Sequence, residues 1–559
     1  MDILKNSLVS RISNCLRHPY LSKVLIGLGV LLRTKHFLEN RSLRLDEAAL
    51  FLTLTQKSAE YNPSLPIAPI GFLTMERYLI GMFGPEEWVL RLVPFIASLI
   101  GLFLFYRILP RFVSPLAIPL ALGLVIFSKP MIFYAADFKP YAVDVLAVIG
   151  LLCNVDYLIR LKFRWWQLMM VALWGMVILW YSYPSVFMVG ALVLGVSLRC
   201  VRTRDWERLG IIFGLGVFWA LNFVWLYFMT VKPVAQNTDL HGMWRQGFMP
   251  VALGWSESME WIGLAFKNAI SYMLGIPSLG GFLLMIFGVM ALWKTRRDET
   301  IVLGLMVLLP FLTAVMGKYP FQGRLILFLS PVLAIFTAEG VAVFFRQKRF
   351  QVIGRSVGIL AVVFLLFGWS KSAFDDLTKS HDQEQIRPVM LFLKKYFRRT
   401  DTIYLNNSAF FGLVAYQRIL EFPYRIEVIG RTYDEIYQDK EGYFTEGLYE
   451  RHLYDREKNF LALFYKKGYT FYRINAYQWP CQDEGRVWVL LSHFKPELQK
   501  IILSALDKRG KRLAAYETVG SAVYLYDLEE VACGGKVRCV CVEKITPFPL
   551  DFQDPSIKI

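Results

Sequence analysis

The chain has 559 residues, of which 55% are hydrophobic, and its 62 Lys and Arg against 45 Asp and Glu give a net charge of +17. A composition this apolar excludes a single soluble domain and is typical of a polytopic membrane protein. The positive charge does not predict nucleic-acid binding, because the basic residues stand between apolar runs, as in the cytoplasmic loops of membrane proteins.

Charged residues divide the first part of the chain into about eleven apolar runs, each near the roughly 20 residues that span a bilayer. The predicted spans are 20–37, 90–107, 112–130, 140–159, 165–183, 184–201, 209–230, 270–293, 300–317, 324–345 and 354–370. Pro184 is expected to break the long run from Trp165 to Leu198 into two helices. Basic clusters fall in alternate loops, so the positive-inside rule predicts a cytoplasmic N-terminus and an extracytoplasmic C-terminus. The first apolar run is expected to be a retained anchor, because no cleavage site follows it.

Composition predicts two domains. Residues 1–370 form a transmembrane domain with extracytoplasmic loops at 38–89 and 231–269, and residues 371–559 form a small extracytoplasmic α/β domain. In the second domain, periodicity predicts helices at 386–397 and 495–510 and strands at 402–405, 486–491 and 521–528. The predicted fold class is therefore a mainly α, polytopic membrane protein with a C-terminal α/β domain.

The chain has seven cysteines, of which Cys533, Cys539 and Cys541 lie close together. Their spacing does not repeat as zinc-binding pairs do. We expect either a disulfide or free thiols there.

Two acids open the first outer segment, in "NRSLRLDEAALFLT". Asp46 and Glu47 precede an apolar run, so they can stabilise a helix N-terminus, with Arg41 and Arg44 as interfacial cations. The alternative is a functional role for the acids at the headgroup boundary.

A second charged stretch, "YAADFKPYAVDV", lies on the same membrane face. Pro140 suits the first turn of a helix, which places Lys139 at the positive end of that helix and predicts a phosphate site. Asp137 would repel an anion, so it either orients Lys139 or faces the non-phosphate part of a substrate. Tyr141 and Asp144 follow in the first helical turns. The competing interpretation is a Lys–Asp pair neutralised at the interface.

A second cation stands at another outward-facing helix start, in "GKYPFQGRLILFLSP". Arg324 can hold a phosphate bidentately together with Lys139, although snorkelling to the interface also explains it. Tyr319 precedes it as a substrate-binding candidate. In "DLHGMWRQGFMP", Trp244 is a candidate wall against a sugar ring, and His241 is a weak candidate metal ligand without a second ligand at recognisable spacing.

The ordered motifs "LDEAAL", "APIGFLTMERYL", "VLRLVPFIASLIG" and "YAADFKPYAVDVLAV", with "YPFQGRLILFLSP" later, resemble the GT-C superfamily of membrane glycosyltransferases. They are most similar to the protein O-mannosyltransferase and aminoarabinose transferase-like family. The resemblance implies a transferase of the bacterial inner membrane that uses a sugar linked to a polyprenyl phosphate. The acceptor hydroxyl would belong to a lipid, a glycan or a protein, and transfer would proceed with inversion.

The resemblance also implies residue roles. It makes Asp46 the catalytic base with Glu47 beside it and Asp137 a second acid facing the same site. Lys139 and Arg324 would bind the donor phosphate, with Arg44 as a further cation. No cofactor is certain, although a divalent metal is possible. One departure is that Ile67 and Ala68 precede Pro69, where lipid A-modifying relatives carry a Glu-Lys pair, which argues against assuming the aminoarabinose reaction.

Two alternatives to an enzyme remain. A transporter or flippase of a lipid-linked glycan could use the same outer cations, although the charges cluster at one face and no inverted repeat is evident. A non-catalytic subunit of envelope assembly would use the acids only structurally.

Overall fold

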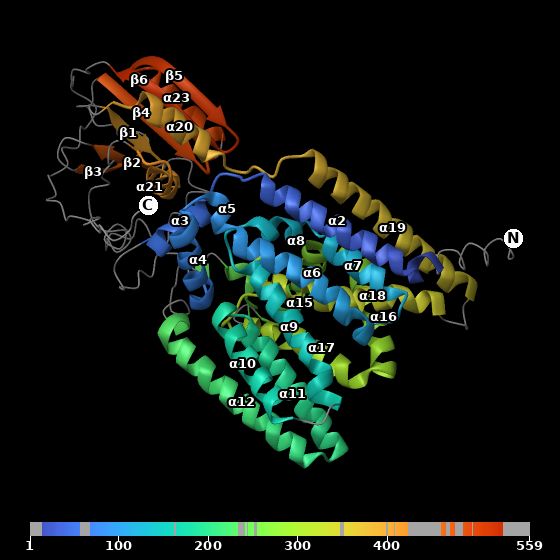
Figure 1. Cartoon of the computed structure of the whole chain (residues 1–559). Helices are drawn as coiled ribbons and strands as arrows, with labels where there is room; N and C mark the ends of the chain where they lie inside the picture. The colour runs from blue at the N-terminus through green and yellow to red at the C-terminus, as the bar shows by residue number, and fades with distance from the viewer. Residues whose placement is uncertain are drawn as a thin grey trace. The chain divides into compact units, whose positions relative to one another are not determined.

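The computed structural model describes residues 14–55, 68–160, 164–232, 241–242, 244–250, 254–346, 351–398, 401–406, 408–422, 460–465, 470–475, 485–494 and 496–528. The predicted cluster of Cys533, Cys539 and Cys541 lies outside them. The chain divides into two compact units (Figure 1). The first comprises Met1–Glu39, Ala68–Tyr78 and Trp88–His381, and the second comprises Asn40–Ile67, Leu79–Glu87 and Asp382–Ile559.

The first unit is helical. Its elements are α2 (Pro19–Leu38), the start of α4 (Ile70–Phe83), most of α5 (Glu87–Leu90), α6 (Leu92–Phe112), α7 (Ala117–Ile126), α8 (Lys129–Phe133), η1 (Tyr134–Ala136), α9 (Tyr141–Arg160), α10 (Trp165–Tyr181), α11 (Ser185–Thr203), α12 (Trp206–Leu226), η2 (Tyr227–Val231), η3 (Arg245–Gly247), α15 (Trp255–Leu274), α16 (Ser278–Thr295), α17 (Arg297–Val315), η5 (Gly323–Leu329), α18 (Ser330–Arg346) and α19 (Gln351–Thr378).

The described residues contain eight helices long and apolar enough to span a membrane, or nine if the bent pair α7 and α8 is one span. The predicted fold class, a mainly α multi-pass membrane protein, is confirmed, but the count of about eleven is not. The break predicted at Pro184 is present, because α10 ends at Tyr181 and α11 begins at Ser185. The predicted span 270–293 is instead divided, since α15 ends before Gly275, whose φ is +64°, and α16 begins at Ser278.

The helix α18 forms the centre of the first unit. In the span Gly323–Arg346, 94% of the apolar window is buried. Gly288 of α16 and Gly340 of α18 let the two backbones approach closely, because a Cβ on Gly340 would stand 1.8 Å from the carbonyl oxygen of Leu284. Close approach through small residues is the usual way in which helices pack inside a membrane.

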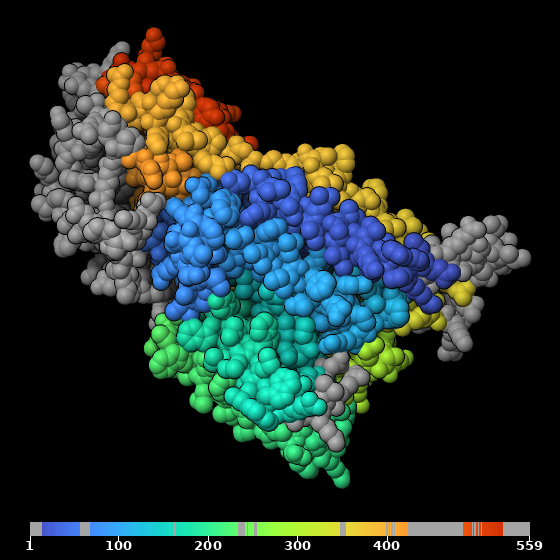
Figure 2. Space-filling view, viewed as in Figure 1, coloured from blue at the N-terminus to red at the C-terminus, as the bar shows by residue number. Residues whose placement is uncertain are grey.

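Apolar side chains also cover the outside of this unit. Leu31 of α2 and Phe103 of α6 are 51% and 54% exposed. Both helices, coloured blue, lie at the surface in Figure 2. Exposed apolar side chains along helices of spanning length are what contact with lipid requires.

The second unit contains α3 (Leu45–Thr55), α20 (Ile386–Tyr396), α21 (Ala409–Ile419), α23 (Pro496–Leu506) and a sheet of β1 (Thr402–Leu405), β2 (Phe460–Tyr465), β3 (Thr470–Asn475), β4 (Gly485–Ser492), β5 (Gly510–Thr518) and β6 (Ser521–Leu528). The strand order is β3-β2-β1-β4-β6-β5. Among the strands that the structure describes, β1 and β4 pair in parallel, with Ile403 opposite Trp488, and the other pairs are antiparallel. The predicted C-terminal α/β fold is confirmed.

The first outer segment belongs to this second unit. The hydroxyl of Tyr416 on α21 accepts from the backbone N–H of Leu43 at 2.7 Å and donates to Glu87 at 2.8 Å. Arg387 pairs with Glu87 at 3.0 Å and donates to the carbonyl of Asn40 at 2.8 Å. These buried bonds fix the chain that leads into α3 on the C-terminal α/β fold.

Candidate functional site

The start of α9 carries the charged stretch that the sequence singled out. Asp137 follows η1 and Lys139 follows two residues later, and both are buried. The amide of Asp144 donates to the carbonyl of Pro140 at 2.9 Å, and α9 begins at Tyr141, directly beside the proline as predicted. Ionisable residues buried at a membrane helix are candidates for a substrate or ion pathway.

The loop at 244–249 and the segment between α17 and η5 pack together beside the start of α9. The amide of Phe321 donates to the carbonyl of Gly247 at 2.8 Å, and that of Met249 donates to Ala314 at 3.3 Å. A Cβ on Gly247 would stand 2.6 Å from Pro320, so only glycine allows this approach. The contact fixes the position of the 244–249 loop relative to the start of η5.

Arg324 is the centre of the arrangement that results. Its guanidinium carbon lies 5.4 Å from the ring centroid of Trp244 and 5.9 Å from that of Tyr141. The structure thus brings together three residues predicted for substrate or phosphate binding. The N–H groups of a guanidinium lie in its own plane. A guanidinium that lies over an aromatic face can therefore still donate to phosphate oxygens at its edge.

Tyr319 supports the same segment. Its hydroxyl donates to the carbonyl of Leu325 at 2.6 Å, and its ring lies 5.1 Å from that of Phe187. Burial, reinforced by the nearby Asp144, raises the pKa of Tyr319 well above its ordinary value. The phenol therefore stays neutral and acts as a hydrogen-bond donor that fixes the residue next to Arg324.

His241 stacks on Phe248, with ring centroids 4.9 Å apart and planes 13° apart. Among the described residues, the group spaced to hold a metal ion is His36, Glu39 and His381. His241 is not a member of it, so its role as a ligand stays a prediction.

The second unit holds the other predicted residues, at the start of α3. The carboxylate of Glu47 is buried, accepts from the backbone N–H of Arg44 at 3.0 Å and lies 3.9 Å from its Nε. Glu47 thus caps the helix, as the structural interpretation of the motif expected. Asp46 is half-buried beside it. Glu384 accepts from the N–H of Leu45 at 2.8 Å.

His493 is a charged neighbour of Asp46 that the sequence did not indicate. Its Nδ1 lies 2.5 Å from the second oxygen of Glu384. The hydrogen bond to Glu384 raises the pKa of His493, and the charge of Asp46 adds to the increase. These groups come from distant parts of the chain, so no local pattern could have signalled them.

Glu76 on α4 was also missed. It is fully buried on the same face as Gly71 and Phe72, and neither carboxylate oxygen has a hydrogen-bond partner among the residues that the structure describes. Burial raises the pKa of Glu76 to about 9, so the group is neutral at pH 7. The ring of Phe72 lies 6.1 Å from that of Phe138, the neighbour of Asp137. The available signal was a lone acid inside "IGFLTMERYLIGMF".

The predicted residues therefore form two groups. Asp137, Lys139, Tyr141, His241, Trp244, Tyr319 and Arg324 belong to the first unit, and Arg44, Asp46 and Glu47 belong to the second. The convergence of Asp46 with Asp137 stays a prediction.

No family model matches the chain, and no curated protein matches it in sequence. Among solved structures it is similar to ArnT from Cupriavidus metallidurans bound to undecaprenyl phosphate, with 13% identity, a TM-score of 0.47, and coverage of 90% of this chain and 97% of that one. It is also similar to the Archaeoglobus fulgidus oligosaccharyltransferase AglB in complex with an inhibitory peptide and a dolichol-phosphate, with 10% identity, a TM-score of 0.45, and coverage of 90% and 74%.

A third similar structure is the Archaeoglobus fulgidus oligosaccharyltransferase in complex with Zn and sulfate, with 14% identity and a TM-score of 0.41. There the alignment covers 67% of this chain and 55% of that one, so this chain spans little more than half of its length. ArnT and AglB are GT-C glycosyltransferases, the superfamily that the ordered motifs resemble. The likeness is one of fold alone.

Proposed function

We propose that this chain is a membrane glycosyltransferase. It moves a sugar from a polyprenyl-phosphate donor to an acceptor hydroxyl of a lipid, a glycan or a protein at the outer face of the bacterial inner membrane. The observation that carries the proposal is the placement of Arg324 against Tyr141 and Trp244 at the start of α9. This arrangement joins a cation suited to phosphate with aromatic faces suited to a sugar ring.

The donor phosphate is bound by cations of the first unit. Lys139 lies directly before Pro140 and α9, where backbone N–H groups and the helix dipole favour an anion. Arg324 supplies a second cation, held in place by the aromatic rings and the 320–325 segment. As the sugar leaves, negative charge builds up on the phosphate oxygen, and fixed cations stabilise that charge most in the transition state.

The acceptor is activated by a carboxylate. Asp46 takes the proton of the acceptor hydroxyl, whose oxygen forms a bond to the anomeric carbon on the face opposite the phosphate. The bond from that carbon to the phosphate oxygen breaks, its electron pair stays on the phosphate, and polyprenyl phosphate is released. Asp137 serves as the second acid and positions the polar part of a substrate, while Arg44 adds positive charge near Asp46.

The test compares two neighbouring acids. Asp46→Asn is isosteric and should lower kcat for sugar transfer by about 10²- to 10⁴-fold, the usual contribution of a general base. Glu47→Gln is the matched control, because Glu47 caps α3 and its loss should affect stability more than the chemical step.

The measurement is mass spectrometry of envelope lipids and glycans from cells with the wild-type chain, each variant or no chain, followed by transfer assays in proteoliposomes with the donor so identified. A product mass that persists with Asp46→Asn would remove Asp46 as the base. If the product mass is missing and the lipid-linked donor accumulates on one leaflet of the membrane, the result would instead favour a flippase.

A further inference from the structure

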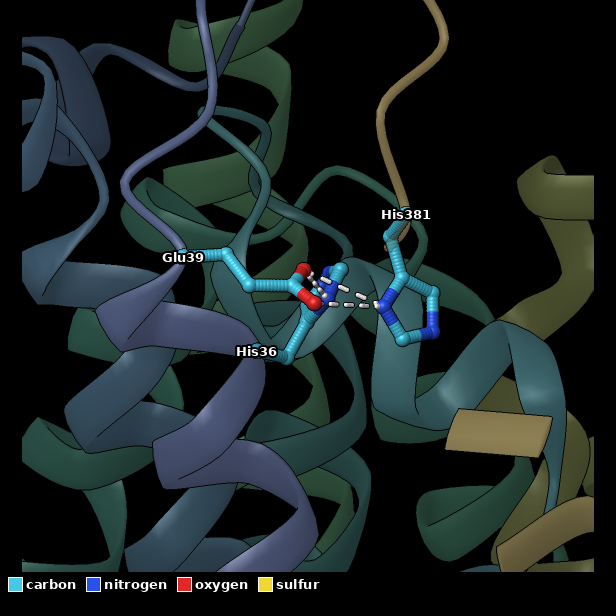
Figure 3. Close-up of side chains that lie close together, drawn as sticks. All are labelled: His36, Glu39 and His381. Carbon is cyan, nitrogen blue, oxygen red and sulfur yellow. Dashed lines mark hydrogen bonds and ion pairs between the residues drawn. The ribbon is translucent and has the colours of Figure 1, made fainter. Parts of the chain in front are cut away.

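Two imidazoles and a carboxylate meet where α2 and α19 end. Glu39 is the C-cap of α2, His36 lies in the last turn of that helix, and His381 follows α19. Figure 3 shows the carboxylate of Glu39 between the two rings. Its Oε2 is 3.2 Å from Nδ1 of His36 and 3.1 Å from Nδ1 of His381. All three residues belong to the first unit.

The far side of each ring is fixed by an acceptor. Nε2 of His36 donates to the carbonyl of Phe133 at 3.0 Å, and Nε2 of His381 donates to Asp376 at 2.8 Å. Carbonyl and carboxylate oxygens only accept, so each Nε2 carries the ring proton. In a neutral imidazole, Nδ1 then presents a lone pair, and both lone pairs are directed at the carboxylate.

This is the pattern of metal-binding histidines, which donate their other N–H to a backbone carbonyl or a carboxylate. The carboxylate of Asp376 is itself held by the hydroxyl of Ser372 at 3.3 Å, and that hydroxyl also contacts the carbonyl of Phe127 at 2.9 Å. Both rings are thus oriented by neighbours that an ion pair with Glu39 alone would not need.

The distances also fit a small ion. Ligands about 2.0–2.1 Å from a tetrahedral zinc stand about 3.3 Å from one another. The two nitrogen-to-oxygen distances are 3.2 and 3.1 Å, and the three ligand atoms lie within 4.8 Å of one another. Binding requires only that the two rings move toward each other over the carboxylate.

We propose that His36, Glu39 and His381 bind one Zn²⁺, with water as the fourth ligand. Two imidazoles and one carboxylate are ligands that zinc prefers, and Glu39 and Asp376 balance its charge. Lys35 contacts Oε1 of Glu39 and donates to the carbonyl of Lys379 at 2.8 Å, so Oε2 is the oxygen directed at the ion. The site is structural and takes no part in the proposed sugar transfer.

The position of the proposed zinc site in the chain indicates its structural role. Glu39 and His381 are the last residues of the first unit before the chain continues into the second unit at Asn40 and Asp382. The ion would therefore join the end of α2 to the segment that follows α19, at two of the places where the chain leaves the first unit.

The test uses the purified full-length chain in detergent. After chelation and dialysis, ZnCl₂ is titrated with a competing chromophoric chelator, and bound zinc is counted by elemental analysis. The wild-type chain should bind one equivalent and gain a higher Tm with zinc. His36→Ala, His381→Ala and the isosteric Glu39→Gln should each lower the affinity by 100-fold or more.

The matched control is His18→Ala, which removes an exposed histidine that precedes the same helix. It should bind zinc as the wild-type chain does. Cobalt in place of zinc should give the visible absorption of a tetrahedral site in the wild-type chain and in His18→Ala only.

Two results would overturn the proposal. One is a wild-type chain that binds no zinc and whose Tm changes only with pH. That result would mean that hydrogen bonds alone join the two rings to the carboxylate. The other is unchanged zinc affinity in Glu39→Gln and His381→Ala. If an alanine variant fails to fold, Glu39→Gln keeps the test decisive, because it preserves the shape of the side chain.

Discussion

The two units treat charged residues in opposite ways. In the first unit the guanidinium of Arg324 lies against the faces of Tyr141 and Trp244. In the second unit the carboxylates of Glu47 and Glu384 accept from the backbone N–H groups at the start of α3. Arg324 therefore contacts two aromatic faces, whereas the two carboxylates cap a helix. Charged residues beside a helix start thus contact aromatic rings in one unit and backbone N–H groups in the other, and the proposed function assigns ligand binding to the first arrangement only.

The largest effect should come from removing the cation of the first unit. Arg324→Ala should weaken donor binding by about 10- to 100-fold, because hydrogen bonds to charged groups contribute about 1.5–3 kcal/mol. Arg324→Lys should recover only part of this, since lysine keeps the charge but loses the planar fork. The measurement is binding of undecaprenyl phosphate to the purified chain.

The control is Arg245→Ala, which removes an exposed cation next to Trp244. If both alanine variants weaken binding equally, the effect is general electrostatics and the distinction between the units fails.

The second effect concerns the fold of the second unit. Tyr416→Phe deletes the hydroxyl shared by Leu43 and Glu87 and leaves buried groups without their partner. We expect a loss of about 1–3 kcal/mol. This loss of stability should appear as faster hydrogen exchange of the backbone amides in α3 and α21 of the full chain. Tyr396→Phe, at a residue that is 45% exposed, should leave the exchange unchanged. Equal exchange in the two variants would contradict the role of Tyr416.

A smaller effect should follow from the ring beneath Arg324. Trp244→Leu removes one cation–π contact, which contributes about 0.5–2 kcal/mol, so donor affinity should fall by about 2- to 30-fold. Trp244→Phe should be intermediate. Trp255→Leu, at a residue that is 76% exposed, is the control and should bind donor normally. A Trp244→Leu variant with full affinity would show that the ring does not position Arg324.

The smallest effect should be a pH dependence in the second unit. Glu384 raises the pKa of His493 above its ordinary 6.5, so the pair stabilises the fold fully below about pH 6.5 and loses this contribution as the pH rises through the raised value. Because the imidazole is half-exposed, the gain over His493→Gln should stay below about 1 kcal/mol.

Hydrogen exchange in β4 and α3, measured from pH 6 to 9 with correction for the intrinsic rate, checks this. A difference between wild type and His493→Gln that grows with pH would contradict the sign.

The sequence predicted what local patterns determine. Pro184 marked the break between α10 and α11, and alternation found β4 and β6. The span 270–293 was misplaced because apolar composition continues through "GIPS", although Gly275 and Pro277 are strong helix-stop signals. The predicted span limits were set at charged residues, and the two residues that end the helix carry no charge.

For the candidate site, the sequence predicted Arg324, Tyr141 and Trp244 from their types and flanking motifs, but not that the guanidinium lies over both rings. That contact depends on the approach of Gly247 to Pro320, which only the folded chain reveals. Glu384 and His493 were missed for the same reason, since their neighbour at the start of α3 is far away in the chain.

The contact between Glu39 and His381 can form only late in the synthesis of the chain. The two residues are 342 positions apart, so His381, which follows α19, is synthesised long after Glu39 at the end of α2. Until then the end of α2 carries a histidine and a glutamate whose bonding is incomplete. A chain that ends before His381 would lack this partner of Glu39.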